Sequence, residues 1–193
     1  LVLAIIFATI GIPYAFDARW TSAWWALEAA GVYWIGCRQR QTLTRAFALL
    51  LQVGAGIAFA TDLHREADRM FLNADFLGMA LIALAALASA WLADRYREHV
   101  TAWERAVVPL IIAWAMVWWY WGAARELLPE LSGRAMPNAM LAFVTATVAL
   151  ALVVRRALRW SRLVWLGVVL LPAMLLVGIS DWERMHTTLR AWG

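Results

Sequence analysis

Residues 76–97 read FLGMALIALAALASAWLADRYR, an apolar run that ends at Asp94 and two arginines, Arg95 and Arg97. About 20 apolar residues cross the hydrocarbon core of a bilayer as a helix, and about 17 is the lower limit. The apolar part of this stretch, 76–93, falls inside that range. It therefore predicts a membrane-spanning helix whose end is marked by arginine.

Similar apolar runs recur along the whole chain. The sequence is 64% hydrophobic and 16% charged, with a mean hydropathy of +0.67, well outside the usual range for a soluble domain. We expect an all-α fold: a single transmembrane region, 1–193, forming a polytopic helix bundle of about seven spans with short loops. Besides 76–93, the predicted spans are 1–16, 20–37, 46–60, 106–124, 138–154 and 163–180.

Arginine orients this bundle, because all seventeen basic residues are Arg. Loops 38–45, 95–105 and 155–162, together with the adjoining Asp94, hold ten Arg and three acids, a net charge of +7, whereas the other side holds seven Arg and nine acids. The positive-inside rule places the three arginine-rich loops in the cytoplasm. It also accounts for the net charge of +4, so no nucleic-acid partner is predicted. Arg45 precedes the third span as cut at 46–60, although Thr42, Leu43 and Thr44 could extend that span past it. We expect Glu104 to belong to a solvated helical extension.

Glu28 is the acidic residue that lies inside a predicted span, about halfway along 20–37. A charge at that depth costs about 3 kcal/mol on insertion scales, so Glu28 should face protein or water. Gln52 has a similar depth in 46–60, on a stripe of small residues with Ala48, Gly56 and Ala60. We hypothesise that Glu28 and Gln52 meet across the helix interface as a midplane polar site. The alternative is that Glu28 is neutral and only fixes packing.

Tryptophan, threonine and small residues support the same division into spans. Trp118, Trp119 and Trp121 are predicted to sit in the interfacial belt at the end of 106–124, and Trp114 to pack between helices. Thr145 and Thr147 are expected to bond the carbonyl one turn back. The stripe Ala85, Ser89 and Ala93 is explained by helix packing alone.

The first outer turn supplies a second group of candidates: Asp17 and Arg19 are close enough to pair at the interface, beside Trp20. Segment 62–75 adds further acids on the same side. No familiar metal-ligand spacing occurs there, so no metal site and no cofactor are predicted. The sequence also lacks a glycine-rich phosphate loop, a Gly-x-Ser-x-Gly elbow and a His-Glu-x-x-His motif.

Several of these residues resemble a known family. Pro13 precedes Asp17-Ala-Arg-Trp-Thr21 and Trp25-Ala-Leu-Glu28, and later come Phe71-Leu-Asn-Ala-Asp-Phe-Leu-Gly78 and Ser89-Ala-Trp-Leu92. Together they are similar to the bacterial predicted membrane proteins called domain of unknown function 2339, most closely through about residue 93. The resemblance implies a multi-pass protein of the bacterial inner (plasma) membrane. It also implies that the chain is a fragment of a longer protein whose further transmembrane helices would be its partners, together with the lipid bilayer. It implies no reaction.

Three classes of function remain open. Transport or cell-envelope support would use Glu28 and Gln52 as a midplane site. A membrane-embedded enzyme acting on a lipid-linked or envelope substrate would place its chemistry at the outer interface, around Asp17, Arg19 and segment 62–75. A structural or assembly protein would use small-residue stripes and Trp surfaces and needs no catalytic group. We rank transport or envelope support ahead of catalysis; the oligomeric state is not predicted.

Overall fold

The structure is a computed structural model that describes residues 18–61, 73–130 and 135–169. These residues form helices and turns, and no strand occurs among them. The chain divides into two compact units, 1–122 and 123–193, and each is described by itself. The all-α prediction is confirmed for the described residues.

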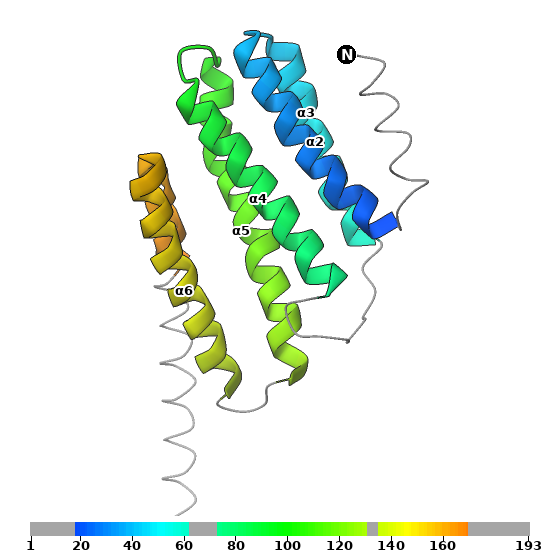
Figure 1. Ribbon diagram of the computed structural model, residues 1–193, viewed down its shortest axis with the longest axis vertical. Helices are drawn as coiled ribbons and strands as arrows, with labels where there is room; N and C mark the ends of the chain where they lie inside the picture. The colour runs from blue at the N-terminus through cyan, green and yellow to red at the C-terminus, as the bar shows by residue number, and fades with distance from the viewer. Residues whose placement is uncertain (1–17, 62–72, 131–134, 170–193) are drawn as a thin grey trace, which may run out of the picture. The chain divides into compact units, whose positions relative to one another are not determined.

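The first unit contains α2 (Ala18–Arg38), α3 (Thr42–Thr61), α4 (Ala74–Arg95) and most of α5 (Ala102–Glu130). Short turns join α2 to α3 and α4 to α5 at the same end (Figure 1). Helix α2 packs against α3 and α4. Helix α4 begins at the N-cap Asn73, whose side-chain oxygen accepts a bond of 2.7 Å from the Phe76 backbone N–H.

The core of this unit is built from small and aromatic side chains. Its buried members include Ala26, Ala55, Phe59, Met79 and Trp118. Where helices approach most closely, glycine provides the room. A Cβ on Gly56 would lie 2.5 Å from Cζ2 of Trp114, and one on Gly78 would overlap the ring of Phe59. These glycines let aromatic rings lie directly on helix backbone.

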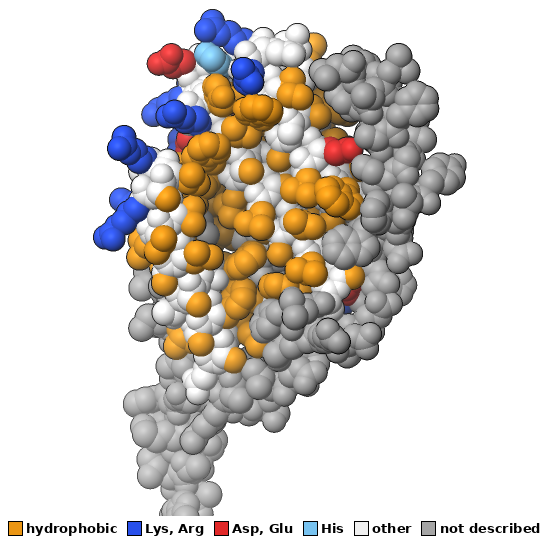
Figure 2. All heavy atoms as spheres, in the orientation of Figure 1, with side chains coloured by type: hydrophobic (Ala, Val, Ile, Leu, Met, Phe, Trp, Pro, Cys, Tyr) orange, Lys and Arg blue, Asp and Glu red, His pale blue; other side chains and the backbone are white. Residues whose placement is uncertain are grey.

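The outward face of α3 is apolar. Leu43, Phe47, Leu50 and Ile57 repeat at helical spacing and are all exposed, Leu43 to 86%. Figure 2 shows hydrophobic side chains spread over the helices. An apolar helix surface of this kind suits lipid or another apolar helix rather than water.

Among the described residues, four helical segments have the length and composition to cross a membrane: Thr42–Thr61, Ala74–Arg95, Ala102–Leu127 and Asn138–Leu158. They coincide with the predicted spans 46–60, 76–93, 106–124 and 138–154. Helix α2 covers the predicted span 20–37 and is long enough to cross, but its Trp, Tyr, Glu, Ser and Thr content makes it less apolar than those four. Span 1–16 and most of 163–180 lie outside the described residues, so the number seven stays a prediction.

The second unit contains α6 (Ala135–Leu158) and the 3₁₀-helix η1 (Ser161–Val169), which pack against each other. Thr145 and Thr147 donate to the Leu141 and Phe143 carbonyls, at 2.8 and 2.9 Å, as predicted. The start of the predicted span 163–180 is thus a 3₁₀-helix as far as Val169.

Candidate functional site

A buried ion pair joins the first turns of α3 and α5. Nε of Arg45 donates to Oε1 of Glu104 at 2.6 Å, and Nη2 donates to Oε2 at 3.0 Å. Both side chains are completely buried, at 0% exposure. The two parallel bonds make a bidentate guanidinium–carboxylate contact, which fixes the relative orientation of both groups as well as their distance.

The remaining donors and acceptors of this pair are also satisfied. Nη1 of Arg45 donates to the Gly36 carbonyl at 3.1 Å, and Nη2 also donates to Thr42 Oγ1 at 3.2 Å. The Thr101 backbone N–H and hydroxyl both donate to Oε2 of Glu104, at 2.6 and 2.7 Å. Every side-chain nitrogen of Arg45 and both oxygens of Glu104 therefore have partners, which a buried charge requires.

Gly36 is needed for this geometry. A Cβ there would lie 2.7 Å from Cγ of Arg45 and 3.2 Å from its backbone nitrogen. The α2 backbone therefore passes directly over the arginine stem. The ion pair thus connects the end of α2 to the starts of α3 and α5.

The two turns at this end also touch directly. Nδ1 of His99 lies 3.1 Å from the Cys37 carbonyl, within hydrogen-bond distance. Nη1 of Arg105 donates to the carbonyls of Arg97 and Val100, at 3.3 Å each. Loops 38–45 and 95–105 were predicted to share one side, and in the structure they lie together.

Helix α3 begins at Thr42, so the third span extends past Arg45, as the sequence allowed. One sequence expectation is wrong at this point, because Glu104 is not solvated. Each residue buries its charge against the other, and a count of charges per loop cannot reveal such a pairing. A signal was present in Thr101-Ala-Trp-Glu104, which has the Ser/Thr-x-x-Glu spacing of a capping box at the start of α5.

Gln52 lies halfway along α3 and is 2% exposed. Its Nε2 is buried and has no hydrogen-bond partner among the described residues. The predicted contact is therefore not made through this nitrogen. Glu28, midway along α2, is partly buried and has an interaction of its own.

Three indole N–H groups are also buried without a hydrogen-bond partner among the described residues. They are Nε1 of Trp25, Trp114 and Trp118. Trp118 and Trp114 both lie against Gly56, one helical turn from Gln52, with Nε1 of Trp118 3.2 Å from the position of a Gly56 Cβ. The face of α3 that carries Gln52 and Gly56 thus packs against the indoles of Trp114 and Trp118 on α5.

Trp118 is not the interfacial residue we expected. It is 2% exposed, its ring packs edge-on against Phe59 at 5.8 Å, and α5 continues well beyond it to Glu130. The prediction that Trp114 packs between helices is confirmed. The same holds for Ala85, Ser89 and Ala93, which are buried, with the Ser89 hydroxyl bonded to the Ala85 carbonyl at 3.1 Å.

The outer-interface candidates lie largely outside the described part of the structure. Asp17 lies outside the described residues, as does most of segment 62–75. Arg19 and Trp20 belong to the first turn of α2, but their side chains are not described. Asp75, at the end of that segment, is buried in the first turn of α4. Within the described ranges, no group of three or more His, Cys, Asp or Glu residues has a metal-binding arrangement.

Long apolar helices, a lipid-suited outer face and charges gathered at the turns define an integral membrane protein of the helix-bundle class. The family model for "Predicted membrane protein (DUF2339)" matches residues 1–192, so the chain belongs to that family. No curated protein and no solved structure matches the chain.

Proposed function

We propose that the protein acts in transport or in support of the cell envelope. Its first unit provides a site for a small polar solute at the middle of the membrane. The site is centred on Gln52, with Glu28 as its protonatable group. The observation that carries this proposal is the buried, unpartnered Nε2 of Gln52 in the core of the bundle. Leaving such a donor unpaired costs about 1–3 kcal/mol, which packing alone does not repay.

The chemistry of the neighbouring groups limits the solute. Gln52 Nε2 and the indole nitrogens of Trp114 and Trp118, which pack one helical turn away against Gly56, are hydrogen-bond donors. A bare metal cation needs oxygen ligands and is poorly served by such a set. Water, a carbonyl or a carboxylate accepts hydrogen bonds and is well served. Glu28 contributes a partly buried carboxyl midway along α2.

Proton flux into proteoliposomes tests whether Glu28 acts as the protonatable group of this transport site. The full chain would be reconstituted with an internal pH-sensitive dye and a membrane potential imposed by potassium and valinomycin. Glu28→Gln is expected to lower the flux at least tenfold while the protein remains folded. Glu98→Gln is the matched control, because Glu98 is an exposed glutamate in the α4–α5 turn. Equal flux in the wild type and in Glu28→Gln would exclude Glu28 as the proton carrier.

Gln52→Leu separates transport from packing. The substitution removes a buried donor without a partner, so the thermal midpoint should rise. The transport proposal also requires that the flux fall. A higher midpoint with unchanged flux would show that Gln52 is not part of a transport site.

A second candidate is a structural or assembly role, and the Arg45–Glu104 pair favours it. This contact joins three helix ends with every side-chain N and O atom satisfied, as expected of a rigid scaffold. Unchanged proton flux in both the Glu28 and the Gln52 variants would favour this role. Catalysis at the outer interface, around Asp17, Arg19 and Trp20, remains a prediction from the sequence.

A further inference from the structure

The turn between α6 and η1 is closed in an unusual way. Arg159 follows the last residue of α6 and has a φ of 51°, in the left-handed region. The Trp160 backbone N–H donates to the Arg155 carbonyl at 3.1 Å, and the Trp160 side chain is buried. This is the hydrogen bond of a Schellman motif, in which glycine is the usual residue at the left-handed position. Here the position carries a cationic side chain instead.

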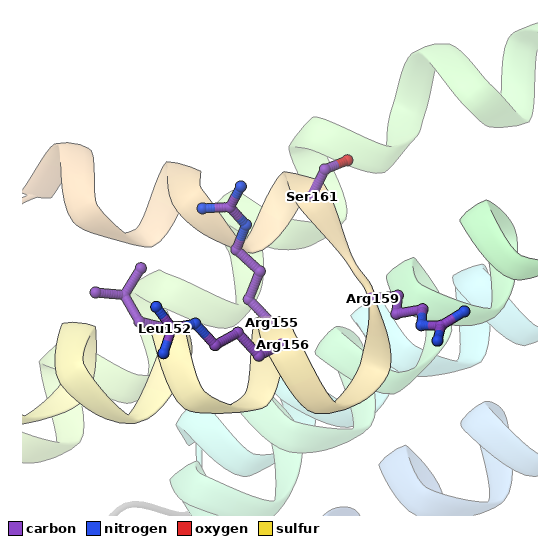
Figure 3. Close-up of a pocket in the computed structure, with 5 residues that line it drawn as sticks. All are labelled: Leu152, Arg155, Arg156, Arg159 and Ser161. Atoms are coloured by element: carbon purple, nitrogen blue, oxygen red, sulfur yellow. The ribbon is translucent and has the colours of Figure 1, made fainter.

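A surface pocket of about 510 Å³ opens at this turn. Its lining residues come from the last two turns of α6, the turn itself and the start of η1: Leu152, Arg155, Arg156, Arg159 and Ser161. Figure 3 shows the guanidinium groups of Arg155 and Arg156 on one side of the turn, Arg156 reaching toward Leu152 and Arg155 toward η1. The Arg159 side chain extends the other way.

The arginines of this pocket have no counter-charge nearby. Arg155, Arg156 and Arg159 are exposed and form no hydrogen bond or ion pair through their side chains with the described residues. No acidic residue occurs between Glu130 and Asp181 in the sequence. In the other arginine-rich turns, Arg45 is paired with Glu104 and Arg105 bonds backbone carbonyls, whereas Arg95 and Arg97 are exposed. Unpaired guanidinium groups on adjacent residues are suited to a phosphate, whose oxygens accept their paired N–H donors.

The walls of the pocket indicate which phosphate fits. It lies at the end of the apolar segment Asn138–Leu158, where a membrane-spanning helix reaches the headgroup level. Leu152 lines it, and Leu150 and Val153 beside it are 58% and 65% exposed. A ligand with a phosphate next to hydrocarbon would contact both kinds of surface, whereas free phosphate would contact the arginines alone.

We propose that the α6–η1 turn binds the phosphate of an anionic phospholipid headgroup. Arg155 and Arg156 hold the phosphate oxygens, and Leu152 contacts the upper part of an acyl chain. Arg159, on the other side of the turn, raises the local positive potential. The positive-inside rule explains why arginines lie on this side of the membrane, but not why two adjacent unpaired arginines line a pocket beside Leu152.

Lipid binding by native mass spectrometry tests the proposal. The full chain in detergent would be titrated with phosphatidylglycerol, with phosphatidylcholine as the zwitterionic comparison. The variant Arg155→Gln with Arg156→Gln should bind phosphatidylglycerol at least tenfold more weakly. The control, Arg95→Gln with Arg97→Gln, removes two exposed charges from the α4–α5 turn and should change binding less than twofold.

Two outcomes would overturn the proposal. Equal losses in both double variants would mean that phosphatidylglycerol responds to overall charge rather than to this pocket. Displacement of the lipid by millimolar inorganic phosphate would mean that the turn is a free-anion site. Circular dichroism checks that each variant is folded. If the double variant is not, Arg155→Gln and Arg156→Gln are tested singly, each with an expected loss of at least threefold.

Discussion

Removing the charge of Glu104 should destabilise the first unit more than any exposed substitution in the same turns. Glu104→Gln keeps the shape of the side chain and can still accept a hydrogen bond from the Thr101 backbone N–H, as a capping box allows. It leaves Arg45, completely buried, with a charge that no partner neutralises. A guanidinium does not release its proton at accessible pH, so the cost cannot be avoided by deprotonation.

The expected magnitude follows from the geometry. Breaking a fully buried pair by removing one partner costs about 3–5 kcal/mol of folding free energy. In a chain of this size, each kcal/mol shifts the melting midpoint by about 2–4 °C. Glu104→Gln should therefore lower the midpoint of the protein in detergent by about 6–20 °C. Circular dichroism at 222 nm during a thermal ramp measures the shift.

A second substitution, at Arg45, tests whether the loss of stability comes from the unpaired buried charge. Arg45→Met removes the charge and keeps an unbranched stem of similar length, so combining it with Glu104→Gln leaves no buried charge. The double variant should recover most of the lost midpoint, with a coupling energy of at least about 2 kcal/mol. Glu98→Gln, in the exposed part of the same turn, is the control. The reasoning fails if Glu104→Gln shifts the midpoint no more than that control, or if the two substitutions are simply additive.

Two further predictions concern helix packing and capping. Gly56→Ala should destabilise α3 packing by about 1–3 kcal/mol, because the new Cβ would lie 2.5 Å from Cζ2 of Trp114. Gly54→Ala, whose Cβ would have nothing within 4 Å, should instead stabilise the protein by about 0.5–1 kcal/mol. Equal thermal shifts in the two variants would refute the close contact at Gly56. Asn73→Ala should cost about 1 kcal/mol through loss of the bond from the Phe76 N–H, whereas Asn73→Asp should retain it; chemical denaturation of both variants measures the difference, and equal stability would contradict the cap.

The sequence predicted the helices well because their signal is local. The run 76–93 is apolar along its whole length, and the helix in the structure, Ala74–Arg95, is only two residues longer at each end. The ends were less accurate where polar residues continue a helix. Helix α3 begins at Thr42, the longer of the two starts that the sequence allowed, and Arg45 buries its charge within the first turn.

The candidate site was harder to predict because it depends on which helix faces meet. Gln52 was chosen for its depth, and its burial is confirmed. The pairing with Glu28 rested on the assumption that neighbours in sequence supply each other's partners. In the structure, the face of α3 that carries Gly56 meets the indoles of Trp114 and Trp118 on α5. No spacing within α3 alone specifies that contact.

The contrast between two buried polar groups in this bundle supports a function for one of them. Arg45 and Glu104 have a hydrogen-bond partner for every side-chain nitrogen and oxygen, so the fold is able to satisfy even a costly pair of charges. Gln52, further along the same helix α3, keeps a buried side-chain donor that has no hydrogen-bond partner in the described part of the chain. Leaving this donor unpaired costs stability, and a leucine at the same position would avoid that cost. A solute that binds there explains the glutamine better than packing does.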